Sequence, residues 1–302
     1  ERKSRKDKSS KINPIMSIQS PLILLITTVL VSKNLLGSVD YYAPHPFGTQ
    51  CEYALGADEV TSGKWWLSPK NEPAREKSFR EWICARPRDK ALAFAIYTHN
   101  AGTLKLTAQC FPLLPEEPKE ATLELLIGGN WEKVQQASVV YPGWSLHFRI
   151  DGWDSSKDVQ YRVQLGELSK YEGLIRKDPV DKKSIVLASM SCNSPADKPR
   201  YARTQMVANL LEHDPDLLFF AGDQNYIHDE PTYGWLMFGV QFGKVMKDRP
   251  TICIPDDHDV GHPNLWGESG KKAIARDFDG GYLYPASFVN MVQRQQCWSL
   301  PD

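Results

Sequence analysis

The sequence predicts an N-terminal antiparallel β-sandwich followed by an α/β domain. Three observations lead to this fold class and to a site within it. Short runs that alternate between apolar and polar residues, separated by turn signals, fill residues 89–178. From residue 184 onward, continuous apolar runs alternate with segments of helical spacing, which is typical of parallel strands buried on both faces. Polar side chains directly follow three of these runs, at the strand ends where α/β sheets bind ligands.

Residues 1–40 carry the features of a secretory signal peptide. The basic stretch ERKSRKDKSSKINPI precedes the apolar run PLILLITTVLV and the small residues of LLGS, an order that is typical of export signals. The apolar run is too short for a membrane-spanning helix, which needs roughly 20 apolar residues. We therefore expect no stable membrane span and a secreted, periplasmic or cell-surface protein. A buried N-terminal helix or strand is the alternative, and a start at Met16 would remove the basic stretch.

Composition narrows the classes of partner. The 302 residues have a net charge of −1 and 41% hydrophobic content, which supports a sizeable core and gives no sign of specific nucleic-acid binding. The six cysteines show no CxxC spacing, so a structural zinc site of that type is not expected. In an exported protein, Cys51, Cys84 and Cys110 are candidates for a disulfide of open connectivity. Cys253 is expected to be a small buried residue.

The β part follows an N-terminal extension. Residues 41–88 are rich in Pro, Trp and charge, with a short helix expected near residues 72–84. The sandwich is placed at residues 89–178, with the turn signals NAG, PEEPK, GGN, YPG and DGWDSSKD between its strands. Its expected strands lie in the runs ALAFAIYTHN, TLKLTAQCF, ATLELLIGG, WEKVQQASVVY, WSLHFRID and DVQYRVQL.

The α/β part is placed at residues 184–302. Its expected strands are SIVLASMS, DLLFFAGD and TICIPDD, with helices at 201–213 and 233–247 between them. Successive strand ends are about one βαβ unit apart. Because ligands bind beyond the carboxyl ends of such strands, we expect Cys192, Asp223 and the stretch Asp256–His258 to meet at one rim.

The residue types at this rim suit metal ions. Thiolate, carboxylate, imidazole and phenol groups ligate hard or borderline metals, and Tyr226 is close enough to Asp223 in sequence to reach the same ion. Thiolate with phenolate favours Fe³⁺ over Mg²⁺, and a carboxylate between two ions can bridge them. Each piece also has a simpler interpretation: Gly222-Asp223 as a turn, Cys192 as a small buried residue, and the acidic stretch as a helix N-cap. Their joint occurrence at three successive strand ends favours the metal site.

Three motifs in this order resemble the PhoD-like phosphatases of the metallophosphoesterase superfamily: SMSCN at 189–193, FFAGDQNY at 219–226 and PDDHDVGHPNLWGE at 255–268. The resemblance covers most of the chain after about residue 85. It implies a catalytic domain with two central sheets flanked by helices. It also implies an alkaline phosphatase D-like centre of two metal ions, Fe³⁺ and Ca²⁺, that cleaves phosphate mono- or diesters.

The resemblance also assigns roles by motif position. Asp223 would bridge the two ions, with Cys192 and Tyr226 on the iron. The metal ligands that it implies are Cys192, Asp223, Tyr226, Asp256 and Asp257. His258 and Asp257 would be the catalytic residues, next to the second metal or the phosphate.

The chain departs from the family pattern in two places. The loop after the acidic motif reads GHPNLWG where other members have an Asn-rich stretch. The substrate contacts assigned by motif position are Asn225, next to Tyr226, and His262 and Asn264 in this departing loop. Members of the superfamily carry further His and Asp ligands downstream, whereas this chain ends at SLPD. The α/β domain is therefore expected to be incomplete at its C-terminus and inactive on its own.

Two functions remain open from the sequence. The first is a metal-dependent hydrolase that acts on a phosphate ester with a metal-bound hydroxide at a two-metal centre. The alternative is a non-catalytic secreted or surface binding protein with a degenerate phosphatase domain, which the missing downstream ligands favour. The joint presence of Cys192, Asp223, Tyr226 and Asp257 favours the enzyme, because a degenerate domain has no reason to keep all four in place.

Overall fold

The computed structural model describes strands and helices within the second of two compact units, Glu1–Asp40 and Tyr41–Asp302. The described residues are 87–113, 117–141, 143–194, 203–226, 231–260, 265, 267, 271–274, 280–282, 284 and 286–302. Several expectations lie outside these residues: the signal segment 1–40, the helix near 72–84, Cys51, Cys84, His262 and Asn264.

The first sheet is antiparallel and has three strands. After the short 3-10 helix η3 (Arg88–Lys90), the strands β1 (Leu92–Asn100), β2 (Thr103–Cys110) and β5 (Ser145–Asp151) pair in the order β1-β2-β5. The turn Ala101-Gly102 joins β1 to β2, with φ values of 46° and 78°, because a two-residue hairpin turn of this kind matches the right-handed twist of its strands. The expected strands and turn are confirmed here.

The second sheet is antiparallel and has four strands. β3 (Glu120–Ile127), β4 (Asn130–Ser138), β6 (Val159–Leu165) and β7 (Ser169–Ile175) pair in the order β4-β3-β6-β7. β6 alternates buried and more exposed residues, so one of its faces points into the core. The strand β7 was not among the strands expected from sequence.

The two antiparallel sheets share one hydrophobic core. Its buried side chains include Tyr97, Leu104, Leu123, Trp144, Phe148, Tyr161 and Val163. The rings of Tyr97 in β1 and Tyr161 in β6 meet edge to face, with centroids 6.3 Å apart. Burying each such side chain contributes about 1.5–3 kcal/mol, so this shared core holds the two sheets together. Cys110 is a free thiol inside it, and burial raises the pKa of this thiol to about 12.

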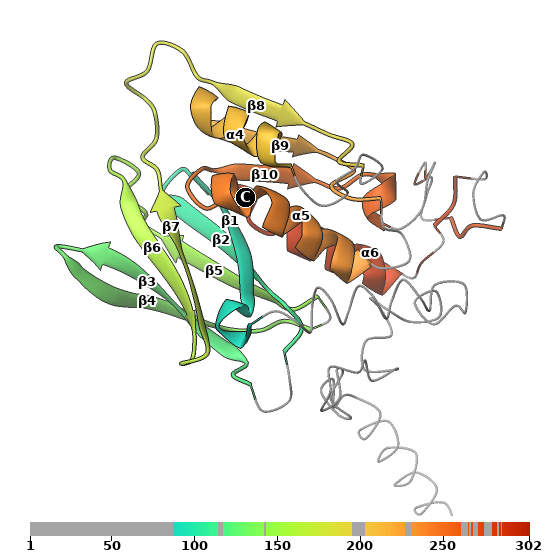
Figure 1. Ribbon diagram of the computed structural model, residues 1–302, viewed down its shortest axis with the longest axis horizontal. Helices are drawn as coiled ribbons and strands as arrows, with labels where there is room; N and C mark the ends of the chain where they lie inside the picture. Colours follow the sequence, from blue (N-terminus) through green and yellow to red (C-terminus); the bar gives the residue numbers. More distant parts are fainter. Residues whose placement is uncertain are drawn as a thin grey trace, which may run out of the picture. The chain divides into compact units, whose positions relative to one another are not determined.

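A third sheet is parallel and carries the rim. β8 (Leu187–Met190), β9 (Leu217–Ala221) and β10 (Thr251–Ile254) lie side by side in the order β10-β9-β8 (Figure 1). The helices α4 (Thr204–His213) and α5 (Pro231–Met246) connect them. The 3-10 helix η4 (Asp257–Val260) follows β10 directly, and α6 (Ala286–Cys297) packs against β10. The expected parallel strands and their two connecting helices are confirmed, whereas α6 was not expected.

The expectation that these parallel strands are buried on both faces is wrong. One face, with Leu218 and Phe220, is buried. On the other face, Leu187 is 53% exposed and Ile254 is 44% exposed. A continuous apolar run shows that both faces of a strand are apolar, but it does not show that a partner covers each of them. In the described residues this is the single parallel sheet, so the second central sheet implied by the resemblance is not among them.

The parallel sheet shares a second core with β1. Phe94 and Ile96 of β1 pack with Phe220 of β9 and with Trp235 and Phe238 of α5. The rings of Phe94 and Trp235 are 5.2 Å apart, and those of Trp235 and Phe238 are stacked at the same distance. The antiparallel and parallel regions are therefore joined by apolar packing. Whether residues 89–178 and 184–302 are separate domains stays a prediction.

Polar contacts strengthen the junction between these regions. Trp235 Nε1 donates to Gln109 Oε1 at 3.0 Å, and Gln109 Nε2 donates to the Gly143 carbonyl at 2.7 Å. From α6, Gln295 Nε2 donates to the same carbonyl at 2.8 Å. All three side chains are buried, where a satisfied polar network fixes one arrangement of the surrounding elements. In the described part of the chain, no helix is both long and apolar enough to span a bilayer.

The end of the chain packs on the first sheet. Lys105 Nζ donates to the Leu300 carbonyl at 2.9 Å, and the His147 ring lies 4.7 Å from the Trp298 ring. Burial lowers the pKa of His147 to about 4, and the charge of Arg294 adds to this effect. The neutral imidazole is therefore part of the folded contact.

This contact predicts a pH-dependent loss of stability. Above the ordinary histidine pKa of about 6.5 the ring is neutral in both states. As pH falls toward 4, the unfolded chain takes up a proton that folded His147 does not, so about 3 kcal/mol of stability is lost through this window. Urea unfolding at pH 7.5 and 4.5 should show a smaller loss for His147→Gln than for the wild type. The control is His213→Gln, on the exposed end of α4; an equal pH dependence of His147→Gln and wild type would contradict the prediction.

Candidate metal centre

The loops after β8 and β9 are tied together at the carboxyl edge of the parallel sheet. The Cys192 N–H donates to the Gly222 carbonyl at 3.2 Å, and the Asn193 N–H donates to the Asp223 carbonyl at 2.8 Å. These bonds continue the pairing of β8 with β9 past the strand ends. Cys192 and Asp223, far apart in sequence, therefore lie next to each other as the topology predicted.

Both residues have a left-handed backbone. Cys192 has φ 55° and Asp223 has φ 56°, a conformation that costs free energy for most non-glycine residues and clusters at functional sites. Gly222, between β9 and Asp223, has φ 92°, and a Cβ there would lie 2.6 Å from the Asp256 Cβ. Glycine at this position is thus required for the loops after β9 and β10 to approach each other.

Asp223 is the centre of the side-chain contacts. It is buried, at 7% exposed. Its Oδ2 accepts the Tyr226 hydroxyl at 2.8 Å and lies 3.6 Å from Cys192 Sγ. Its Oδ1 is buried and has no hydrogen-bond partner among the described residues. Because a buried carboxylate oxygen without a partner is costly, this oxygen is the atom that a cation would satisfy.

A second group of possible ligands also includes Asp223. Ligand atoms of Asp223, Asp257 and His258 all lie within 4.8 Å of one another. The His258 N–H donates to Asp257 Oδ1 at 2.8 Å, and the His258 ring lies 4.0 Å from the Tyr226 ring at 37°. Within the described residues this is the one cluster of three or more such side chains. It can hold a metal ion.

Tyr226 is a neutral phenol in this arrangement. Burial, followed by hydrogen bonds with Cys192 and Asp223 and by their charges, raises the pKa of Tyr226 well above its usual range. The Tyr226 hydroxyl donates its hydrogen bond to Asp223 Oδ2, so a cation bound to the phenol oxygen would have to displace that proton. Tyr226 is therefore placed to act as a ligand only if a strongly polarising ion is bound.

Sequence reasoning gave no role to Asp259, which the structure places beneath the rim. Asp259 is 3% exposed. Its Oδ2 accepts the N–H groups of Asp223 at 2.8 Å and Asp256 at 3.0 Å, and its Oδ1 accepts that of Gln224 at 2.9 Å. Burial raises the pKa of the Asp259 carboxyl to about 7, and the charge of Asp223 adds to this, although hydrogen bonds from the Asp256 backbone and the Gln296 side chain lower it. Asp259 thus fixes the backbone that presents the ligands.

The remaining expected site residues lie around this group. Asp256 is exposed, and its Oδ1 accepts the Asp257 N–H at 2.8 Å. Asn225 is buried, with its amide against Gly234 of α5. Cys192 is a free, exposed thiol.

The donor set fits metal ions. Cys192 and Tyr226 bring a sulfur and a phenol oxygen to Asp223, and Asp257 and His258 bring a carboxylate and an imidazole to the same residue. Asp223 alone belongs to both sets, and its unpartnered Oδ1 leaves an acceptor for a cation. A set with thiolate and phenolate ligands and a set with carboxylate and imidazole ligands suit two different metals better than two identical ones.

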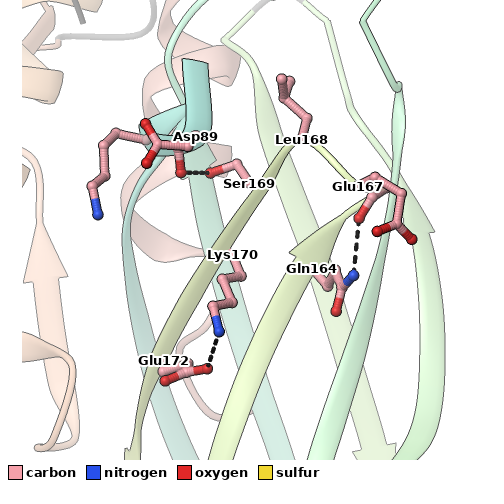
Figure 2. A pocket seen from close by; sticks show the side chains of 9 residues that line it. Asp89, Gln164, Glu167, Leu168, Ser169, Lys170 and Glu172 are labelled. Carbon is pink, nitrogen blue, oxygen red and sulfur yellow. Dashed lines mark hydrogen bonds and ion pairs between the residues drawn. The ribbon is translucent and has the colours of Figure 1, made fainter. Parts of the chain in front are cut away.

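A cavity also lies among residues 89–90 and 164–172, which are remote in sequence from the rim. It has a volume of about 480 Å³, and Figure 2 shows that Lys170 reaches Glu172 while Ser169 bonds to the Asp89 backbone. The Lys170–Glu172 distance is 3.3 Å, and Ser169 Oγ donates to the Asp89 carbonyl at 2.8 Å. These side chains satisfy one another, so the rim is the better candidate for chemistry.

Comparison with known proteins gives distant likenesses among solved structures only. No protein-family model matches the sequence, and no curated protein matches it. Among solved structures, the chain is similar to a purple acid phosphatase isolated from yellow lupin (Lupinus luteus) seeds, at 14% sequence identity and a TM-score of 0.44. The match covers 63% of this chain and 38% of that chain.

Proposed function

We propose that this protein is a metal-dependent hydrolase of phosphate mono- or diesters. The observation that carries the proposal is the convergence of Cys192, Asp223, Tyr226, Asp257 and His258 on one edge of the parallel sheet. Carboxylates shared between neighbouring metal sites are the arrangement that in-line phosphoryl displacement uses. The PhoD-like resemblance of the three motifs points to the same chemistry and stays a prediction.

The residues divide between two proposed ions. Cys192 and Tyr226 would hold the ion with thiolate and phenolate ligands, for which Fe³⁺ is proposed, and Asp257 with His258 would hold a second ion, for which Ca²⁺ is proposed. Asp223 would contribute one oxygen to each. When bound, the cations would supply Lewis acidity, which lowers the pKa of water and offsets the charge on the phosphoryl oxygens.

The chain itself orients the reacting groups. His258 is held by its ring contact with Tyr226 and by the bond from its backbone N–H to Asp257. The ring nitrogen of His258 that does not ligate the second ion would donate a hydrogen bond to a phosphoryl oxygen. Asp259 holds the backbone of Asp223 and Asp256, which keeps the carboxylates in position without reorganisation during the reaction.

The proposal predicts a coloured protein. Full-length protein loaded with Fe³⁺ should show a visible charge-transfer absorption from Cys192 thiolate and Tyr226 phenolate, and should hydrolyse para-nitrophenyl phosphate. Cys192→Ser should remove or shift the band, because a serine hydroxyl is a harder and weaker ligand for this transition. The measurement is the absorption spectrum together with bound iron per chain.

The matched control is Cys297→Ser. Cys297 is a half-buried thiol on α6 that donates to the Cys253 carbonyl at 3.5 Å, and its replacement should leave the band unchanged. An iron-loaded protein without a visible band, or a band that is unchanged in Cys192→Ser, would contradict the assignment of Cys192. Absence of both bound metal and ester hydrolysis in the wild type would leave the non-catalytic binding protein as the better account.

A further inference from the structure

A cavity of about 210 Å³ opens beside the proposed metal centre. Cys192 and Asp223 line it, so it is continuous with the rim. Its apolar lining comes from Met190, Met206, Phe220 and Phe242. Its polar lining includes Asn193, Gln224 and Arg203. We call it the Cys192 cavity.

Arg203 brings a positive charge to the Cys192 cavity in a fixed position. Its Nε donates to Asn193 Oδ1 at 2.7 Å, and its Nη2 donates to the Ser194 carbonyl. Asn193 is itself held, because its Nδ2 donates to the Gln224 carbonyl at 3.0 Å and to Gln241 Oε1 at 2.9 Å. Among the described residues, both acceptors of Arg203 are neutral groups, so neither of them neutralises its positive charge. A planar guanidinium held in this way is suited to phosphate oxygens.

The apolar lining sets the size and character of what fits. Phe220 and Phe242 are almost fully buried, while Met206 is 44% exposed and Met190 is half-buried. A dry apolar cavity of about 150 Å³ is enough to hold a benzene ring, whereas drug-sized ligands occupy about 300–1,000 Å³. The Cys192 cavity therefore has room for one ring or a short chain. Methionine side chains adapt to either shape.

We infer that the Cys192 cavity is the substrate subsite that selects phosphate esters of small apolar alcohols, such as aryl or short-chain alkyl monoesters. Arg203 binds the phosphoryl oxygens, and Met190, Met206 and Phe220 receive the alcohol group. This inference rests on the proposed function, because it assumes that the ester bond is placed at the neighbouring metal centre. Bulky or strongly polar alcohols are disfavoured, since they exceed the cavity or leave polar groups against its apolar lining.

The test compares two esters on one metal-loaded, full-length protein. Met206→Gln should lower kcat/KM for para-nitrophenyl phosphate about tenfold and change that for glycerol phosphate less than about twofold, because the lost contact is apolar. The control is Gln205→Ala, the neighbouring exposed position on α4, whose side chain bonds to Asn209 at 2.8 Å. The control should leave both values unchanged.

A binding measurement tests Arg203 without turnover. Calorimetric titration of metal-free protein with phenylphosphonate should show affinity about tenfold weaker for Arg203→Gln, with partial recovery in Arg203→Lys because the charge is restored. Hydrolysis of both esters at an unchanged ratio in Met206→Gln would overturn the inference and leave the proposed function standing. Phenylphosphonate binding that depends on Arg203, with no hydrolysis of either ester by the wild type, would instead overturn the proposed function and keep the anion subsite. Binding unaffected by Arg203→Gln would overturn the role of Arg203.

Discussion

Asp223→Asn should lose bound metal and ester hydrolysis together. Asp223 belongs to both proposed ligand sets, and its Oδ1 is buried without a partner in the described residues. An amide keeps one oxygen but replaces the other with an NH₂ group that repels a cation. Because changes to residues that merely support a metal ligand already cost about 10–100-fold in affinity or activity, we expect a loss of more than about a hundredfold here. Metal per chain after dialysis and turnover of para-nitrophenyl phosphate measure it.

The metal-free stability of this variant separates loss of a ligand from loss of the fold. Without a cation, Asp223 is a buried carboxylate whose charge acts against that of Asp259. Removing that charge should leave thermal stability equal to or above that of the metal-free wild type, as is common for residues kept for activity. The control is Asp181→Asn, an exposed carboxylate in the loop before β8. Near-normal metal content and turnover in Asp223→Asn would show that Asp223 is not the bridging ligand.

The sequence predicted strands where pattern and turn chemistry agreed. The β1–β2 hairpin had both alternation and the turn Ala101-Gly102. The sequence pattern did not predict β7, because SKYEGLI has few apolar residues and an internal glycine. Gly173 is accommodated there because it lies against the ring of Tyr161, a tertiary contact that no local pattern encodes. Strand propensity is overridden in this way by the neighbours of a strand.

The helix α6 was missed for a related reason. Phe288, Met291 and Val292 have helical spacing and are buried. The same helix buries Gln295 and Gln296, each 2% exposed, which breaks the apolar stripe. Gln295 is buried because it donates to the Gly143 carbonyl of the β part. A polar residue whose partner is distant in sequence looks like a surface residue when the sequence is read alone.

The location of the candidate site was predictable, but the direction of each side chain was not. Runs that end in polar residues, together with parallel topology, bring Cys192, Asp223 and the acidic stretch to one edge. Within that stretch, a 3-10 helix turns consecutive side chains to different sides. Asp257 and His258 therefore face the metal centre while Asp259 turns into the protein. The left-handed backbone of Cys192 could not be predicted from sequence either, since cysteine has no preference for that conformation.

Asp259→Ala should destabilise the fold as well as the site. Its carboxylate accepts the N–H groups of Asp223, Gln224 and Asp256 in a buried environment. Alanine leaves these three donors without their acceptor, and each buried unsatisfied group costs about 1–3 kcal/mol. Partial relaxation should bring the total to about 3–5 kcal/mol of unfolding free energy. Urea unfolding of metal-free, full-length protein measures it.

Two further variants show whether Asp259 acts by positioning the other ligands. Asp259→Asn keeps one acceptor oxygen, so its cost should be smaller than that of Asp259→Ala. Asp257→Ala removes a proposed ligand that is half-buried, so it should abolish metal binding while changing the unfolding free energy by less than about 1 kcal/mol. The two variants therefore differ in one measurement: Asp257→Ala lowers metal binding alone, whereas Asp259→Ala lowers both metal binding and the unfolding free energy. If Asp259→Ala costs less than about 1 kcal/mol, water has replaced its carboxylate, and the backbone of Asp223 is held by the loops alone.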